Sequence, residues 1–321
     1  MKLQQLRYAW EVYRRGNHIS AAAEALHTSQ PGISKQIKLL ESELGFEIFA
    51  RRRNRIVGLT EPGREVVSAA QRILTDIDNL RNLGEDYSSS SAGSLTIATT
   101  HTQARYVLPK IIERFVKRYP AIRIGLRQGN PTQVCEFVEA GHADIAIGTE
   151  TTRAFPNLVM LPCFQLHRSV IVKRGHPLLK VKKLTLEEIA KYPIISYDPA
   201  YSGYWRVTEA FKKAGIEPNV IFGAVDADVS KTYVEHGLGI AILTTIAFDA
   251  QHDRGLSARD ASHLFAPSTS YITLRANTYL RKFVYDFIKS VAPALEPEVV
   301  RAALRKSKAA KPGAAAAAGA S

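Results

Sequence analysis

A polar stretch rich in serine and glycine, residues 84–93 (GEDYSSSSAG), divides the chain into two regions with different hydrophobic patterns. Such a stretch has almost no apolar side chains to place in a core and is typical of a flexible linker. The region before it has helical periodicity, whereas after it short β-branched runs alternate with amphipathic segments. The chain is therefore predicted to hold a small, mostly helical domain followed by a larger α/β domain.

Length and composition limit the class of protein. The chain has 321 residues, of which 45% are hydrophobic and 23% charged, enough for about two globular domains. We expect a cytoplasmic protein, because no apolar run could span a membrane and the N-terminus lacks the apolar core of a signal peptide. Cys135 and Cys163 are too few for a disulfide framework and are expected to be ordinary buried thiols, a sensing disulfide being the alternative.

The charge is strongly basic and unevenly distributed. The formal net charge is +13, and residues 1–64 carry 11 Lys/Arg against 6 Asp/Glu. Such a balance favours a polyanionic partner, most simply nucleic acid. Residues 306–321 are rich in Ala, Gly and Lys and are expected to be disordered, either as a solvated tail or as a source of non-specific affinity for DNA.

Residues 20–41 have the pattern of two short helices joined by a tight break. The first, SAAAEAL, is rich in small residues that allow helices to approach closely. After the break, Ser29 is a good N-cap and Pro31 falls in the first turn, where its missing N–H costs nothing. Ile33, Ile37 and Leu40 form an inward stripe. This is a helix-turn-helix, in which the second helix enters the major groove of DNA.

The chemistry of the outward residues gives them roles. Gln30 can pair with adenine and Lys35 with guanine, whereas Ser34 and Lys38 suit phosphate. The run RRRNR at residues 51–55 precedes a short extended segment, which indicates a wing that contacts the DNA backbone or minor groove; a merely solvated charged face is the alternative. The residues expected to contact DNA are Ser29, Gln30, Pro31, Ser34, Lys35, Lys38, Arg51, Arg53 and Arg55.

Residues 62–83 form a long predicted helix with one apolar stripe. Its apolar residues follow three- and four-residue steps from Val66 to Leu83, Thr60 can cap it, and Pro62 suits its first turn. Two interpretations remain open. The stripe packs on its own small domain, or it pairs with the same helix of a second copy.

After the linker, the order strand, helix, strand, helix, strand over residues 95–149 predicts a parallel sheet with right-handed crossovers. The helices of this series are expected at residues 103–118 and 132–140. A second α/β series continues to residue 291. Two such series suggest two subdomains that face each other across a cleft.

The sequence resembles a known family of proteins. The stretch AAAEALHTSQPGISKQIKLLESELGFEIFARRRNRIVGLTEPGREV is similar to the DNA-binding domain of LysR-type transcriptional regulators. The segments SLTIATTHTQARYVLP and VDADVSKTYVEHGLGIAIL resemble the CysB-like branch of that family, which acts in sulfur assimilation and sulfonate utilisation. The resemblance runs from residue 1 to about residue 293.

The resemblance implies a fold, partners and a function. The fold would be α/β with an all-α winged helix-turn-helix N-terminal domain and a C-terminal part like a periplasmic binding protein. The chain would be an activator that binds promoter DNA, RNA polymerase and a small anionic effector: sulfate, thiosulfate, adenylyl sulfate or acetylserine. It would assemble as a homotetramer, a dimer of dimers. The expected division is 1–60 DNA-binding domain; 61–92 linker helix and hinge; 93–293 effector domain, with subdomains 93–162 plus 267–293 and 163–266; and 294–321 C-terminal helix and tail.

Hydroxyl and amide side chains gather where the first predicted strand meets its helix. Thr100, Thr102 and Gln103 follow the strand, at the position where open α/β sheets bind ligands and a helix N-terminus favours an anion. Thr149 ends the third strand at the same edge, and Ser202 precedes a helix of the second subdomain. The alternative is that these hydroxyls only cap helices.

The resemblance carries the family's effector positions onto Thr100, Thr102, Gln103 and Thr149, and His101 lies among them. Ser202 stands where CysB-like proteins have threonine, and Leu166 stands where tryptophan is expected. These departures lie on the second wall of the cleft, so the effector could be a sulfonate as readily as a ligand of the cysteine regulon.

No catalytic motif, phosphate loop, metal-ligand pair or cofactor fingerprint occurs in the sequence, so an enzyme is not expected. Two other functions remain open at this point. One is a LysR-type regulator of an unrelated pathway, and the other is a solute-binding α/β protein whose N-terminal helices serve only to dimerise.

Overall fold

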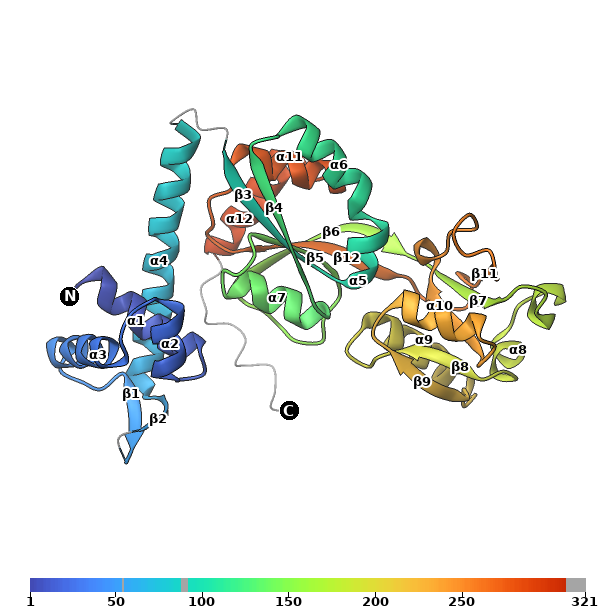
Figure 1. The fold of residues 1–321 in the computed structure, drawn as a ribbon, viewed down its shortest axis with the longest axis horizontal. Coiled ribbons are helices and arrows are strands. Elements are labelled where there is room, and N and C mark those ends of the chain that lie inside the picture. Colours follow the sequence, from blue (N-terminus) through green and yellow to red (C-terminus); the bar gives the residue numbers. More distant parts are fainter. Residues whose placement is uncertain (54, 88–91, 310–321) are drawn as a thin grey trace. The chain divides into compact units, whose positions relative to one another are not determined.

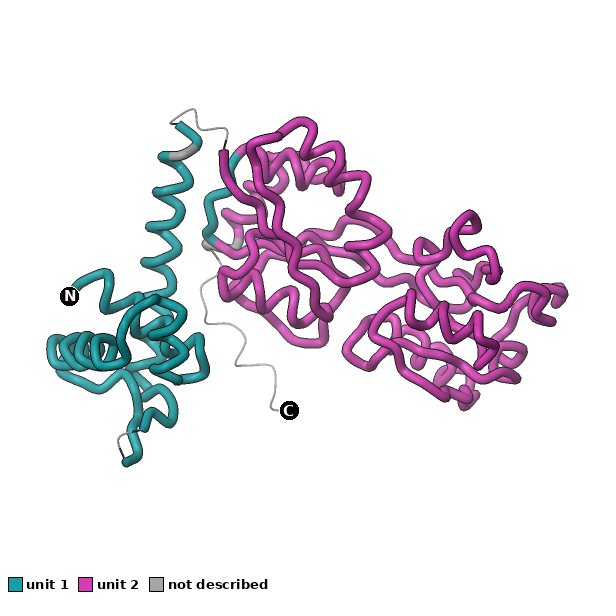
Figure 2. The backbone as a smooth tube through the Cα atoms, viewed as in Figure 1, with its two compact units in different colours: residues 1–89, 277–281 teal, residues 90–276, 282–321 magenta. Residues whose placement is uncertain are grey.

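The computed structural model describes residues 1–53, 55–87 and 92–309. It forms two compact units, residues 1–89 with 277–281 and residues 90–276 with 282–321 (Figure 2). Residues 88–91 of the predicted linker and residues 310–321 of the predicted tail lie outside the described residues. None of the described helices is both long enough and apolar enough to cross a bilayer.

The first unit is a winged helix-turn-helix (Figure 1). Its elements are α1 (Leu3–Arg14), α2 (Ile19–Ala25), α3 (Gln30–Leu44), β1 (Phe49–Arg52), β2 (Arg55–Leu59) and α4 (Glu61–Tyr87). Helix α3 begins as predicted, because Ser29 Oγ accepts the N–H of Gly32 at 3.2 Å. Ile33, Ile37 and Leu40 are buried, which confirms the inward stripe. The predicted fold is therefore confirmed for this unit.

Helix α4 packs only the first part of its apolar stripe on its own domain. Thr60 caps it by accepting the N–H of Gly63 at 2.9 Å, as predicted. Val67 and Ala70 are buried in the same core as α1 to α3. Further along the helix Ile73 and Leu80 are exposed, with exposed fractions of 39% and 67%, and Leu74 and Ile77 are half-buried. The beginning of α4 therefore completes its own domain, and the remainder presents an apolar stripe.

The end of α4 lies beyond the predicted end at residue 83. The helix continues through Gly84 to Tyr87. Near this end the carboxylate of Asp86 accepts hydrogen bonds from Tyr279 Oη at 2.9 Å and Arg281 Nε at 3.0 Å, which belong to the same unit. These tertiary contacts stabilise a helical turn that the local composition did not predict.

The second unit contains two five-stranded sheets. The first has the order β4-β3-β5-β12-β6, with β3 (Gly93–Thr99), β4 (Ile122–Gln128), β5 (Ile145–Thr149), β6 (Leu158–Leu166) and β12 (Ser268–Arg275). The second has the order β11-β7-β10-β8-β9, with β7 (Arg168–Lys173), β8 (Ile194–Tyr197), β9 (Val220–Ala224), β10 (Ile240–Thr244) and β11 (Leu256–Asp260).

Both sheets are mixed rather than wholly parallel. Strand β3 pairs in parallel with β4 and β5, as predicted. Strand β12, however, runs antiparallel to β5 and β6, and β7 runs antiparallel to β10 and β11. The prediction of a parallel sheet is therefore correct only for the strands joined by helices. It missed β6 and β11, which no helix connects to their neighbours in the sheet.

Helices cover the sheets (Figure 1). They are α5 (His101–Tyr106), α6 (Leu108–Arg118), α7 (Pro131–Glu139), α8 (Leu186–Ala190), α9 (Ser202–Ala214), α10 (Ala227–Glu235), α11 (Lys282–Val291) and α12 (Pro297–Ala309). The single helix predicted at residues 103–118 is wrong, because the chain forms α5 and α6 with a break at Val107. Pro109 has no N–H to donate to the preceding turn, which accounts for the break.

The chain passes between the two subdomains twice, at His167 between β6 and β7 and again between β11 and β12. The expected boundary at residues 162–163 falls inside β6. The strand continues because it stays paired with β12 as far as Leu166, which lies opposite Ser268. At each crossing, a strand of one sheet therefore ends before a strand of the other sheet begins.

A polar network joins α5 of the first subdomain to α10 of the second. Tyr106 Oη donates to Asp228 Oδ1 at 2.6 Å and accepts from Lys231 Nζ at 2.9 Å. Arg105 Nε lies 2.8 Å from Asp228 Oδ2, and His101 Nε2 lies 3.2 Å from the same oxygen. The carboxylate of Asp228 thus contacts three side chains of α5.

Asp228 stays ionised in this setting. Burial opposes its charge, but hydrogen bonds from Tyr106 and His101 and the positive charge of Lys231 outweigh burial, so the pKa of Asp228 is lowered. A carboxyl whose pKa is lowered by folding stabilises the protein above its unfolded pKa. This stabilisation is lost as the pH falls through the folded value.

We predict that Gly63→Ala and Gly84→Ala, the same change in the same helix, have opposite effects. A Cβ at Gly63 would overlap the carbonyl oxygen of Ile48, whereas a Cβ at Gly84 would meet no atom within 4 Å. Gly63→Ala should lower the free energy of unfolding by about 1–3 kcal/mol, and Gly84→Ala should raise it by about 0.5–1 kcal/mol. Urea unfolding followed by circular dichroism measures both, and equal effects would contradict the packing of α4.

We also predict that Asp228→Asn lowers the melting temperature at neutral pH. The difference from the wild-type protein should shrink as the pH falls below the unfolded pKa of about 4 and through the lower pKa of Asp228 in the folded protein. Asp76→Asn, a change at an exposed carboxyl of α4, is the control and should leave the melting temperature close to that of the wild type. A difference that stays constant down to pH 2 would argue against an ionised Asp228 in the network.

Candidate functional site

The outward face of α3 presents the residues predicted to contact DNA. Gln30, Pro31, Lys35 and Lys38 are exposed, and Ser34 is half-buried. Gln30 Oε1 accepts a hydrogen bond from Ser20 Oγ at 3.2 Å, which orients the amide at the start of the helix.

Strands β1 and β2 form the predicted wing. They pair antiparallel as far as Arg52 opposite Arg55. Arg53 adopts the left-handed conformation at the tip, with φ 49°, and both Arg53 and Arg55 are exposed. Arg52, which was not among the predicted contacts, is exposed beside them. The hairpin therefore concentrates positive charge near its tip.

Arg51 is placed differently from the other predicted arginines. Its Nη2 lies 2.8 Å from Oε2 of Glu41, whose side chain is almost fully buried. Glu41 Oε1 also accepts the backbone N–H groups of Ile48 at 2.9 Å and Phe49 at 3.2 Å. Arg51 is thus part of a brace between α3 and the wing. The run of arginines does not by itself distinguish Arg51 from its neighbours. What distinguishes Arg51 is its ion pair with the buried Glu41, ten residues earlier.

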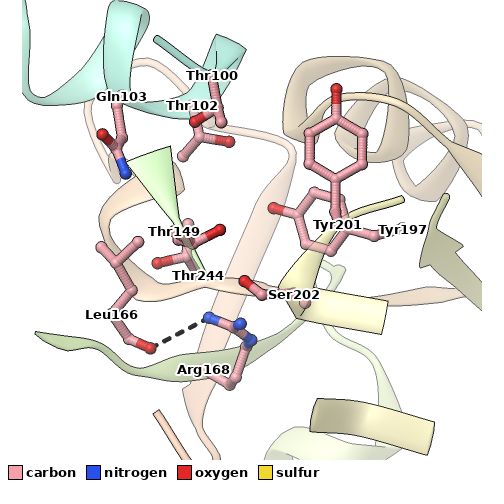
Figure 3. Close-up of a pocket in the computed structure, with 11 residues that line it drawn as sticks. Thr100, Thr102, Gln103, Thr149, Leu166, Arg168, Tyr197, Tyr201, Ser202 and Thr244 are labelled. Atoms are coloured by element: carbon pink, nitrogen blue, oxygen red, sulfur yellow. Dashed lines mark hydrogen bonds between the residues drawn. The ribbon is translucent and has the colours of Figure 1, made fainter. Parts of the chain in front are cut away.

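The second unit contains a pocket between its two subdomains (Figure 3). Its empty volume, mouth included, is about 380 Å³. The residues that line it are Thr100, Thr102, Gln103, Thr149, Leu166, Arg168, Tyr197, Tyr201, Ser202, Gly203 and Thr244. Of the residues predicted for the effector site, all but His101 are brought together here. His101 instead faces Asp228 in the network between α5 and α10.

The hydroxyls of the pocket are not used as helix caps. Thr100 occupies the N-cap position of α5, yet its side chain makes no capping hydrogen bond. Ser202 is the first residue of α9 rather than its cap, and its Oγ donates to Ser268 Oγ at 3.0 Å. The interpretation that these hydroxyls only cap helices therefore does not describe Thr100 or Ser202.

Several buried polar atoms at the pocket lack a hydrogen-bond partner. They include Gln103 Oε1, Thr244 Oγ1 and Arg168 Nε. The Gln103 side chain is fully buried, and its Nε2 donates to Ser270 Oγ at 3.1 Å, which fixes the direction of the amide. Buried polar groups are nearly always satisfied in native proteins. Unpaired atoms gathered around one cavity therefore indicate a site for a polar ligand.

Five residues that line the pocket were not predicted from the sequence: Arg168, Tyr197, Tyr201, Gly203 and Thr244. Arg168 is the charged one among them. It is the first residue of β7 and only 2% exposed. Its Nη1 donates to the carbonyl oxygen of Leu166 at 3.1 Å and its Nη2 to Ser268 Oγ at 2.6 Å. Burial lowers the pKa of this guanidinium. The available signal was a charged residue directly before a run of strand residues that are all apolar or small.

The start of α9 completes the far wall. Ser202 and Gly203, the first two residues of this 13-residue helix, line the pocket. A Cβ at Gly203 would come within 2.6 Å of the Tyr197 ring, so only glycine allows the helix to approach so closely. The N-terminus of a helix carries partial positive charge and favours an anion.

One cluster of possible metal ligands occurs among the described residues. Ligand atoms of His101, Asp226 and Asp228 lie within 4.8 Å of one another. Both oxygens of Asp228 already interact with Arg105, Tyr106 and Lys231, so the network between α5 and α10 accounts for this cluster without a metal.

Comparison with known proteins agrees with this arrangement. Residues 3–64 match the family described as "Bacterial regulatory helix-turn-helix protein, lysR family", and residues 88–296 match "LysR substrate binding domain". The transcriptional regulator SsuR of Burkholderia cenocepacia is 45% identical over 96% of this chain and 100% of its own length. The transcriptional regulator CysB of the same organism is 45% identical over 95% of this chain and 97% of its own.

A solved structure extends the comparison to the fold of the second unit. The cofactor-binding domain of the Cbl transcriptional regulator is 37% identical, with a TM-score of 0.64, and the match covers 67% of this chain and 94% of that domain. Both parts of the fold, the winged helix-turn-helix and the two-subdomain unit, thus match parts of known LysR-type regulators. The chain belongs to the LysR family of transcriptional regulators and is related to CysB, SsuR and Cbl.

Proposed function

We propose that this regulator activates genes of sulfur assimilation or organosulfonate utilisation when a small anionic effector occupies the pocket of the second unit. The observation that carries the proposal is the set of unpaired buried polar atoms around that pocket, with the guanidinium of Arg168 among them. Sulfate, thiosulfate, adenylyl sulfate and alkanesulfonates all offer an oxyanion that can accept from Arg168 Nε and the Thr244 hydroxyl, whereas Gln103 Oε1 can only accept a hydrogen bond from a donor of the ligand. A ligand-controlled regulator, rather than an enzyme, agrees with a pocket lined by hydrogen-bonding groups.

The sulfur pathway is proposed from the likeness to the CysB-like branch, and the pocket supports it with one qualification. Ser202 and Leu166 occupy positions where that branch has threonine and tryptophan, and both line the pocket. Leu166 is 4% exposed and gives the pocket an apolar wall. An apolar wall beside an oxyanion site favours an organosulfonate, whose hydrocarbon part needs such a surface.

We propose that the exposed face of α3 reads promoter DNA and that the wing holds its backbone. Gln30 and Lys35 would contact bases, and Ser34 and Lys38 would contact phosphates. Arg53 and Arg55 extend this contact through the wing. Ser29 and Pro31 set the start of α3, and Arg51 braces the wing against Glu41.

The proposed assembly is a homotetramer built from dimers, acting on RNA polymerase in the cytoplasm. The apolar side chains of α4 that its own domain leaves exposed, Ile73, Leu80 and Leu83, supply a surface for pairing with a second copy. Effector binding would favour one arrangement of the two subdomains. It would thereby alter how two DNA-binding dimers occupy and bend a promoter.

We predict that Lys35→Ala weakens binding to the cognate promoter by about 1–3 kcal/mol, because a base contact is lost. Lys182→Ala, which removes an exposed lysine of the second unit, is the matched control and should bind like the wild type. Gel shifts at physiological ionic strength with cognate and random duplexes measure the difference. Equal affinity of the Lys35 variant and the wild type for the promoter would exclude the proposed contact.

We predict that Thr100→Ala and Thr102→Ala abolish the response to the effector but leave DNA binding without effector unchanged. The control is Thr208→Ala, at an exposed position of α9. A thermal-shift screen of sulfate, thiosulfate, acetylserine, adenylyl sulfate and alkanesulfonates identifies the ligand, and promoter gel shifts with and without it give the response. A normal response in both pocket variants would assign the effector to another site.

A further inference from the structure

The pocket holds a positive charge and no negative one. Arg168 is the single charged residue among those that line it, and none of the described lining residues is acidic. The guanidinium contacts only a backbone carbonyl and the hydroxyl of Ser268, and its Nε has no partner. Glu150 attracts this cation through space but makes no hydrogen bond with it. A buried cation without a counter-ion in contact is costly, so a ligand that brings negative charge would stabilise the pocket.

Glu150 is the carboxylate that acts electrostatically on Arg168, and one of its oxygens is engaged elsewhere. Glu150, directly after β5, accepts from Arg206 Nη2 at 3.2 Å and from the backbone N–H of Thr269 at 2.7 Å through its Oε1. Oε1 of Glu150 is therefore held by Arg206 and Thr269, whereas its Oε2 is buried without a hydrogen-bond partner, and Glu150 is not among the residues that line the cavity. A ligand ammonium group in the pocket would face Arg168 and the N-terminus of α9 without a counter-charge.

We propose that this pocket selects ligands that carry an oxyanion and no positive charge, and that Arg168 supplies the selectivity. The inference rests on the proposed function, since it concerns the same pocket, and it narrows the effector class. Sulfate, thiosulfate and simple alkanesulfonates meet the requirement. Amino acids and their esters that keep a free ammonium group do not, so among the candidate effectors O-acetylserine is disfavoured.

The direct test uses three sulfonates of similar size on the wild-type full chain. Ethanesulfonate carries only the anion, isethionate adds a neutral hydroxyl, and taurine adds an ammonium group at the same position. Isothermal titration calorimetry should give similar affinities for the first two and an affinity for taurine lower by about tenfold or more, as expected for an uncompensated charge. This comparison needs no variant and therefore does not depend on how a substitution affects folding.

Variants then assign the selectivity to Arg168. Arg168→Met should lower the affinity for ethanesulfonate by about tenfold or more, whereas Arg168→Lys should retain most of it. Dimethyl sulfone, a neutral analogue, should bind the wild type and Arg168→Met equally weakly. Arg123→Met, at an exposed position of β4, is the matched control. Promoter binding and the melting temperature report whether each variant is folded.

The outcomes separate this inference from the proposed function. If no oxyanion binds while promoter binding is normal, the pocket is not the effector site and both proposals fail. If ethanesulfonate and taurine bind equally well, the charge selectivity is refuted and the pocket remains. If a folded Arg168→Met binds ethanesulfonate as the wild type does, the role of Arg168 is refuted even where taurine is rejected.

Discussion

The guanidinium of Arg168 lies where both connections between the two subdomains meet. It donates to Leu166, the last residue before one crossing, and to Ser268, the first strand residue after the other. Ser202 at the start of α9 reaches the same Ser268 hydroxyl. The relation between the two sheets, the floor of the pocket and the electrostatic character of the ligand site all depend on this one buried cation. The cost of burying this charge accounts for the polar side chains around it.

A corresponding constraint organises the DNA-binding unit. Glu41 lies on the inward side of α3 and binds the backbone of β1 and the side chain of Arg51 at once. Buried carboxylates are tolerated only with such partners. The recognition helix and the wing are therefore joined by a charged group rather than by packing alone, and the orientation of one follows that of the other.

The sequence predicts those parts of the structure whose signals are local. Ser29 and Pro31 mark the start of α3, Thr60 marks the start of α4, and periodic apolar residues mark the buried face of each helix. The parallel strands between helices are predictable for the same reason. Strands β6 and β11 were missed because their pairing is between distant residues, and α4 was predicted too short because Asp86 is held by distant partners.

In the candidate site, too, residues with a local sequence signal were predicted and residues placed by distant contacts were not. Thr100, Thr102 and Gln103 follow a strand directly, and their place at its carboxyl end brings them to the pocket. Arg168 could not be recognised from its neighbours, because its role comes from a crossing point formed by residues 100 positions apart. His101 was grouped with the pocket residues by adjacency alone. On a helix, adjacent residues point in different directions, and His101 turns toward α10.

The position of the pocket at the strand crossings has a mechanical consequence. Each subdomain extends away from this point, so a ligand that changes the angle between the crossing strands by a small amount displaces the distant helices by much more. Contacts made by a few atoms of a small anion can in this way be converted into a shift at surfaces where copies of the chain would meet. Helix α5 connects the two, because its first residues line the pocket while Arg105 and Tyr106 bind Asp228 of the opposite subdomain. The point about which the two subdomains would rotate is therefore also the place where the pocket lies.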